Sequence, residues 1–122
     1  MVRDRAGSDR GGVTVTACLA LIGVLAVTVL IAQVGVAVTA KHRVQAAADL
    51  SALAAAGALD GGAAAGCHRA EDIAGRMGVR STGCVVLGWD VTVTVVGRIS
   101  LGPLGDRDVR AAARAGPAQE SR

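Results

Sequence analysis

A stretch of thirty residues without a charged side chain, from Gly11 to Ala40, constrains this chain more than any other feature. The hydrocarbon core of a bilayer is about 30 Å thick, and about 20 helical residues cross it. The polar side chains between residues 13 and 38 are only Thr14, Thr16, Thr28 and Gln33. A chain of 122 residues has too little other apolar mass to surround such a helix on every side. The stretch therefore predicts a transmembrane helix over residues 11–40.

The charges at the two ends of this stretch favour a cytoplasmic N-terminus, but only weakly. Residues 1–10 form a short leader with three arginines, which is the positive flank expected on the cytoplasmic side. Lys41 and Arg43 flank the other end almost as strongly.

A cleaved signal peptide is the competing interpretation of the apolar stretch. Val38-Thr39-Ala40 has small residues at the two positions that a signal peptidase reads. The apolar region of a signal peptide is typically about 7 to 15 residues long, and this stretch is about twice that length. The length favours a retained anchor over cleavage near Ala40.

Residues 41–60 predict a continuation of the same helix beyond the membrane, because they are rich in helix formers and lack proline. Asp60-Gly61-Gly62 is expected to end it. Two stripes follow helical spacing. The polar stripe consists of Lys41, Gln45 and Asp49, and the apolar stripe, which we expect to pack against the rest of the chain, of Ala46, Leu50, Leu53 and Gly57.

Residues 61–115 predict a small α+β domain that begins with a Gly/Ala linker through Gly66 and a short helix over 67–77. Ser81-Thr82-Gly83 is expected to turn the chain, and 84–87 and 90–96 to form a hairpin. In the second strand, Val91, Val93 and Val95 share the face that packs on the helix, and Thr92 and Thr94 share the other face.

The remaining residues predict a loop, a third strand and a tail. Residues 98–107 contain Gly-Pro and Gly-Asp and are expected to be a loop. Residues 108–114 fit either a helix or a strand beside the hairpin, and we favour the strand. Residues 116–122 form a flexible polar tail. The expected fold is thus a long N-terminal helix that continues into a pilin-like α+β domain with a two- to three-stranded antiparallel sheet.

The three cysteines are of two kinds. Cys18 lies in the apolar stretch and is interpreted as a small buried hydrophobe. Cys67 and Cys84 lie 17 residues apart in the polar part, outside any CxxC motif. We predict a disulfide between them, worth about 3 kcal/mol by the chain-entropy estimate, although two free thiols in a reducing cytosol remain the alternative. A disulfide requires an oxidising compartment, so the C-terminal part is expected to face outward.

Catalytic chemistry finds little support in the sequence. His42 lies in the basic cluster after the apolar stretch and His68 beside Cys67, where surface roles are expected. Asp106 and Asp108 lack further acidic ligands, and Glu71-Asp72 is interpreted as a favourable helix-dipole interaction at the start of the short helix. Hence we expect no catalytic, cofactor or metal site and no small-molecule substrate. Since the sequence has no basic block and Trp89 is its one aromatic residue for base stacking, we expect no nucleic-acid partner.

The helix extension resembles a family of bacterial envelope proteins. A hydrophobic helix followed by AKHRVQAAADLSALAAAGAL is similar to the TadE/TadG-like proteins of tight-adherence (Flp) pilus systems, in which a span precedes a basic doublet and an R-x-QAAADxxALAxA run. The residues that match this run are Arg43, Gln45, Ala46, Ala47, Ala48, Asp49, Ala52, Leu53 and Ala54.

The rest of the chain resembles a short actinobacterial TadE-like group. The two later cysteines recur there, as does a G-x-D-V-x-V-x-V strand, carried here by Gly88, Asp90, Val91, Val93 and Val95. A terminal A-R-A-G-P is carried by residues 113–117. One departure concerns processing, since TadE pseudopilins are cut after a glycine and carry a glutamate five residues into the mature chain. Cleavage after Gly11 or Gly12 would place Thr16 or Ala17 there, which favours an unprocessed, TadG-like state.

The resemblance and the residues together predict a non-enzymatic, single-pass membrane protein that assists a Tad/Flp-like pilus or secretion system. Its expected partners are the lipid bilayer and other Tad-like envelope proteins, or a second copy of itself through the helix. Two alternatives stay open: a secreted effector or adhesin released by cleavage near Ala40, and a small membrane-anchored redox protein that uses Cys67 and Cys84.

Overall fold

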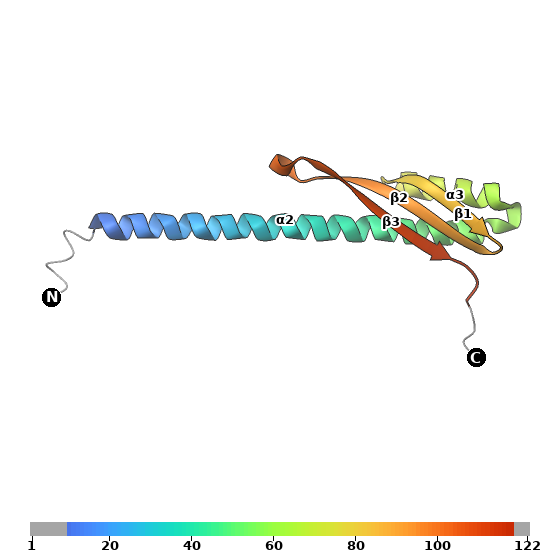
Figure 1. Cartoon of the computed structure of the whole chain (residues 1–122), viewed down its shortest axis with the longest axis horizontal. Coiled ribbons are helices and arrows are strands. Elements are labelled where there is room, and N and C mark those ends of the chain that lie inside the picture. The colour runs from blue at the N-terminus through green and yellow to red at the C-terminus, as the bar shows by residue number, and fades with distance from the viewer. Residues whose placement is uncertain (1–9, 119–122) are drawn as a thin grey trace. The chain divides into compact units, whose positions relative to one another are not determined.

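The computed structural model describes residues 10–118, so the leader before Arg10 and the end of the expected tail lie outside the described residues. The fold is α+β, with one very long helix, a second helix and a three-stranded antiparallel sheet (Figure 1). The elements are α2 (Arg10–Gly57), η1 (Leu59–Gly61), α3 (Ala63–Arg76), β1 (Arg80–Leu87), β2 (Asp90–Ser100), η2 (Gly102–Leu104) and β3 (Asp106–Ala115).

The chain forms two compact units. The N-terminal unit is Met1–Gly35, and the C-terminal unit is Val36–Arg122. α2 is helical from Arg10 to Gly57 without interruption, which confirms that the apolar stretch and its polar extension form one helix. The helix ends at Gly57, three residues before the end expected at Asp60-Gly61-Gly62. A short 3₁₀ turn follows, and Gly62 adopts φ 99° after it.

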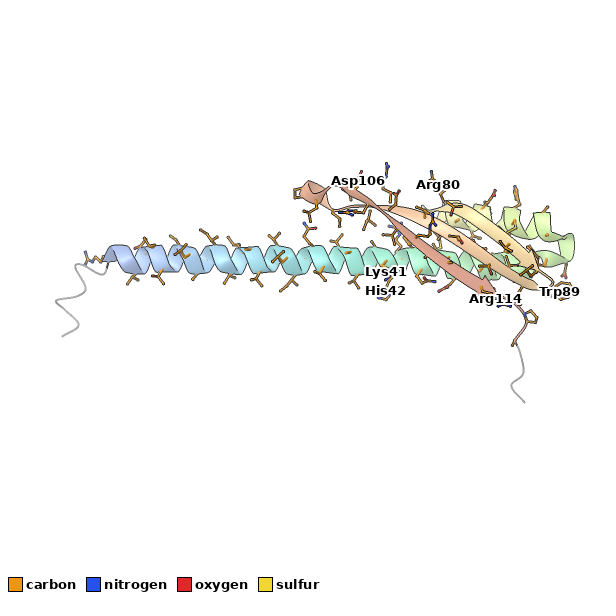
Figure 2. All side chains as sticks on the ribbon, in the orientation of Figure 1. Lys41, His42, Arg80, Trp89, Asp106 and Arg114 are labelled. Atoms are coloured by element: carbon orange, nitrogen blue, oxygen red, sulfur yellow. A yellow bond between two sulfur atoms is a disulfide. The ribbon has the colours of Figure 1, made fainter. Side chains whose placement is uncertain are left out.

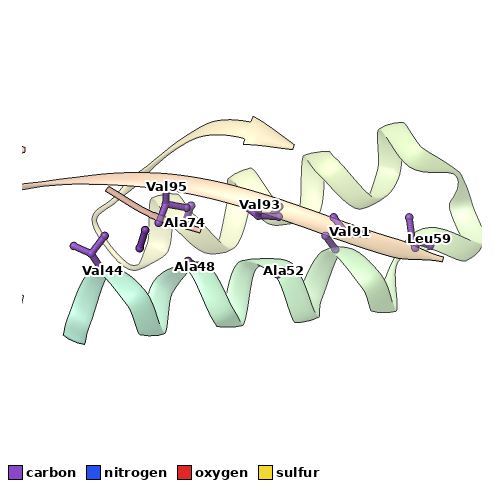
Figure 3. Packing of buried hydrophobic residues seen from close by; sticks show 11 residues of the cluster. Val44, Ala48, Ala52, Leu59, Ala74, Val91, Val93 and Val95 are labelled. Atoms are coloured by element: carbon purple, nitrogen blue, oxygen red, sulfur yellow. The ribbon is translucent and has the colours of Figure 1, made fainter. Parts of the chain in front are cut away.

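The hydrophobic core belongs to the C-terminal unit. Val91, Val93 and Val95 are fully buried and point toward α2, as the alternation in the sequence predicted (Figure 3). The partly buried Thr92 and Thr94 alternate with them. The buried face of α2 consists of Val44, Ala47, Ala48, Ser51, Ala52 and Ala55.

The prediction that the apolar stripe of this helix packs against the rest of the chain is wrong. Ala46, Leu50, Leu53 and Gly57 are exposed, and the alanine-rich face one position further on is buried instead. Both faces satisfy helical spacing, but small side chains let a helix approach a sheet more closely, and the β-branched valines of β2 then fill the space between them. The polar stripe of Lys41, Gln45 and Asp49 is exposed, as predicted.

The second helix begins four residues earlier than predicted, because the Gly/Ala segment forms its first turn and is not a linker. α3 starts at Ala63. Gly66 is buried, and a Cβ there would lie 3.0 Å from the Ala55 carbonyl oxygen and 3.1 Å from Leu59 Cδ2. The glycine therefore serves close packing of α3 against the end of α2. Glu71 and Asp72 consequently lie well inside the helix and not at its start, so the dipole interpretation is also wrong.

The sheet has the order β1-β2-β3 and is antiparallel throughout. The hairpin around Gly88-Trp89 and the third strand are confirmed, but the strands are longer than predicted. Residues 81–83 belong to β1, where a register irregularity between Ser81 and Gly83 replaces the expected turn. The expected loop at 98–107 is shorter, since β2 and β3 stay paired as far as Ser100 and Asp106.

Candidate functional site

The apolar part of α2 presents its side chains outward on all sides. The large hydrophobic residues between Val13 and Val34 are 55% to 67% exposed. Among the described residues, α2 is the one helix that is long enough and apolar enough to cross a membrane. Exposure of such a large apolar surface to water costs free energy, so we expect an apolar environment outside the chain to cover it.

Three threonine side chains of this segment are satisfied within the helix. Thr14, Thr16 and Thr28 each donate a hydroxyl hydrogen bond to the backbone carbonyl four residues earlier, at 2.9, 2.8 and 2.8 Å. Because lipid offers no hydrogen-bond partners, polar groups in a spanning helix must be satisfied internally. The threonines therefore suit an apolar surrounding. Cys18 is exposed on the same segment, so no part of the C-terminal unit covers it, and its burial as a small hydrophobe in the span stays a prediction.

The residues of the QAAAD run divide between the core and the surface. Ala47, Ala48 and Ala52 are completely buried. Ala54 is half-buried. The exposed members are Arg43, Gln45, Ala46, Asp49 and Leu53. The buried alanines thus provide the close contact between helix and sheet. This contact explains why small residues occupy this part of the run.

Gln45 connects the helix to the edge of the sheet. Its Nε2 donates to Asp49 Oδ1 at 3.1 Å and to the Ala112 backbone oxygen at 3.2 Å. β3 is an edge strand, and an otherwise free carbonyl on such an edge invites pairing with another chain. Helical spacing in the sequence places Gln45 beside Asp49, but no sequence signal connects it to Ala112.

A second contact that the sequence did not reveal joins the strand motif to the terminal A-R-A-G-P. The Asp90 carboxylate, at the start of β2, accepts a hydrogen bond from Arg114 Nη2 near the end of β3. The two pieces that resemble the actinobacterial group therefore meet at one end of the sheet, next to the β1–β2 turn at Trp89 (Figure 2).

An exposed apolar patch lies where α2 passes α3. Leu50 is 48% and Leu53 is 64% exposed. Together with Ala54, Ile73 and Met77 they line a shallow groove, with Arg76 beside it. We call this the α2/α3 patch. The leucines expected in the core are instead available for contact with another molecule.

The disulfide joins the second helix to the sheet. Cys67 of α3 and Cys84 of β1 are bonded, with a Cα–Cα distance of 5.8 Å, as expected from the sequence. Cys84 lies opposite Val93 in the sheet, so the bond anchors α3 above the buried valines.

The titratable side chains considered for chemistry do not converge. His42 and His68 are exposed, on α2 and α3. Asp108 lies 3.9 Å from Arg98, and Asp72 pairs with Arg69 at 3.1 Å and Arg76 at 3.4 Å. Among residues 10–118, no group of three or more His, Cys, Asp or Glu side chains is arranged to hold a metal ion.

The fold and its surfaces thus define a protein with a single uncovered N-terminal apolar helix and a small α+β unit. Residues 11–66, a little under half of the chain, match the sequence model of a family described as putative Flp pilus-assembly TadE/G-like. The QAAAD run lies inside this segment, so the resemblance of this part to TadE/TadG-like proteins is confirmed.

One curated relative comes from an actinobacterium. The protein named apoptosis inhibitor Rv3654c, from Mycobacterium tuberculosis, is 52% identical to this chain over 52 residues, which make up 43% of this chain and 62% of the relative. The chain therefore matches less than two thirds of the relative's length. No solved structure matches the chain significantly.

Proposed function

We propose that this protein is a non-enzymatic, single-pass membrane protein that assists a Tad/Flp-like pilus or secretion system. The uncovered apolar helix is the main support for the proposal, since a lipid environment would cover its exposed hydrophobic side chains. Its threonines already donate to backbone carbonyls of the same helix and so require no hydrogen-bond partner from lipid. The match of residues 11–66 to the TadE/G-like model supports the pilus context. The proposal includes no nucleic acid and no small-molecule substrate.

The orientation is part of the same proposal. The N-terminus is cytoplasmic, and the C-terminal unit lies on the extracytoplasmic side of the membrane, because the Cys67–Cys84 disulfide needs an oxidising compartment. There, other Tad-like proteins or a second copy bind through α2, where the α2/α3 patch exposes Leu50 and Leu53.

Thiol labelling in intact cells tests this orientation. We expect a membrane-impermeant maleimide to modify Cys67 and Cys84 only after a membrane-impermeant reductant has been added outside. The matched control is the Cys67→Ser/Cys84→Ser variant, which keeps Cys18. If labelling requires cell lysis, the proposed topology is contradicted. If intact cells are labelled without reductant, the disulfide is contradicted and the outward position of the two cysteines is not.

A released form is the second candidate. The mycobacterial relative is named an apoptosis inhibitor, and that name suits a chain that acts away from its own membrane. Such a form requires cleavage near Ala40. α2 stays helical through that position, whereas proteases generally need an extended substrate. The mass of the mature protein decides between the two: the anchored form retains residues 11–40, and the released form begins near Lys41.

A further inference from the structure

The β2–β3 hairpin extends past the core of the C-terminal unit. Gly97 of β2 lies against α2, where an added Cβ would be 2.5 Å from Val44 Cγ2. Pairing of the two strands continues beyond it through Ile99 with Arg107 and Ser100 with Asp106. Within the C-terminal unit, β2 runs antiparallel to α2, with Val91 toward Leu59 and Val95 toward Val44 (Figure 3). The extension therefore points toward residues 36–43 of α2, where this unit begins. Asp106 and Lys41 lie toward one end of the C-terminal unit, and Trp89 lies at the other (Figure 2).

The reach of the extension can be compared with the rise of the helix. Three strand residues beyond Gly97 cover about 10 Å. At about 1.5 Å per residue, the same distance along α2 leads from Val44 back to about residue 37. Ala37 and Ala40 are half-buried, while Val36, Val38 and Thr39 are exposed. The face that is buried at Val44 therefore continues to Ala37, inside the apolar stretch and beyond the basic residues that end it.

The tip of the hairpin is apolar. Residues 101–105 read Leu-Gly-Pro-Leu-Gly, and Leu104 is 65% exposed. Leu101 is half-buried and Pro103 is exposed. Neither Leu101 nor Leu104 belongs to the hydrophobic core or to the residues packed against it.

Cations outnumber acids at this end of the C-terminal unit. Arg80 and Arg110 both lie opposite Val96 in the sheet, and Arg98 and Arg107 flank the tip. Lys41 and Arg43 follow the apolar stretch on α2. The acids at this end of the hairpin are Asp106 and Asp108, and Asp108 lies 3.9 Å from Arg98. Arginine and lysine beside an apolar insertion are the arrangement that favours anionic lipid headgroups.

We propose that the hairpin tip, residues 101–105, is a second membrane contact, which inserts Leu101 and Leu104 into the interface of an anionic bilayer beside the helix. This inference rests on the proposed membrane anchoring by α2. The tip fixes the C-terminal unit against the membrane surface, so that the α2/α3 patch is held at a set distance from the bilayer.

Tryptophan fluorescence of the full-length protein in nanodiscs tests the proposal, with brominated acyl chains as the quencher. Trp89 is the chain's single tryptophan, is 62% exposed and lies at the end of the unit opposite the tip. In a Trp89→Phe background, Leu104→Trp reports on the tip and Leu25→Trp on the apolar helix. The unchanged protein, with Trp89 alone, is the matched control.

We expect Leu104→Trp to emit at shorter wavelength than Trp89 and to be quenched by brominated lipid, more strongly in phosphatidylglycerol than in phosphatidylcholine. Quenching of Leu25→Trp without quenching of Leu104→Trp would overturn the tip insertion and leave the anchor intact. Absence of quenching at Leu25→Trp would overturn the membrane anchor and the tip insertion together. Equal quenching of Leu104→Trp in both lipids would overturn the role of the arginines.

Discussion

At the scale of single residues, the fold depends on side chains that are small where two elements meet. Ala48 and Ala52 let β2 come close to α2, Gly66 lets α3 approach the Ala55 carbonyl, and Gly97 lies against Val44. Ser51 belongs to the same set, as its hydroxyl is buried without a hydrogen-bond partner and fits where a larger residue would not. Enlarging any of these positions should cost stability through overpacking.

Gly97→Ala should destabilise the C-terminal unit by about 1–3 kcal/mol, the usual cost of an overpacked core. The new Cβ would lie 2.5 Å from Val44 Cγ2 and 3.3 Å from Val79 Cγ1, and both neighbours are β-branched and stiff. Chemical unfolding in detergent, followed by circular dichroism, measures the change.

Two further variants make this prediction specific. Val44→Ala in the Gly97→Ala background should recover part of the loss, because it removes the methyl group that clashes. Gly75→Ala, where an added Cβ meets nothing within 4 Å, should instead stabilise α3 by about 0.5–1 kcal/mol. A Gly97→Ala variant as stable as its parent would show that β2 and α2 are not in close contact there.

At the scale of elements, α3 is held by two different means. Ala70 and Ala74 contribute to the core, but their side chains bury little apolar area. The bond from Cys67 to Cys84 closes a loop of 17 residues and fixes α3 to β1. A helix with so small an apolar contribution should depend strongly on its covalent link.

Replacing Cys67 and Cys84 together by serine should lower the free energy of unfolding by about 3 kcal/mol and expose α3 to protease. Limited proteolysis with mass spectrometry of the fragments measures this. Cys18→Ser is the control and should leave the pattern unchanged, because Cys18 lies outside the C-terminal unit. Protease resistance equal to that of the parent, or free thiols in the native protein, would contradict the importance of the disulfide.

At the scale of the whole molecule, every residue of the hydrophobic core comes from the C-terminal unit. The core runs from Val44 on α2 to Ala111 on β3, and the partly buried Ala115 at the end of β3 packs against it. The N-terminal unit ends at Gly35, and none of its residues from Arg10 onward belongs to that core. The division separates a segment suited to lipid from a unit that buries its own apolar side chains.

A chain that begins at Val36 should therefore fold without the apolar segment and form the Cys67–Cys84 bond in an oxidising buffer. We expect its thermal unfolding midpoint to lie close to that of the C-terminal unit in the full-length protein, because no core contact is lost. Circular dichroism compares the two. Loss of cooperative unfolding in the shorter chain would show that the apolar segment supports the fold directly.

The sequence by itself determined the features that depend on local pattern. Thirty uncharged residues required a long apolar helix, the alternation of Val91, Val93 and Val95 identified the buried face of a strand, and two cysteines indicated the bond between them. The QAAAD run also identified the helix segment that carries the family resemblance.

Only the tertiary structure decided which face of α2 is buried, where α3 begins and how far the hairpin extends. Two stripes on α2 had helical spacing, and the alanine face prevailed over the leucine face because the sheet can approach it more closely. In the sequence, Gly66 is typical of a linker, whereas in the fold it lies against Ala55 and allows α3 to pack there. The contact of Gln45 with Ala112 joins residues far apart in the chain. Periodicity records which residues share a face, but close approach depends on the partner surface, which the local sequence does not contain.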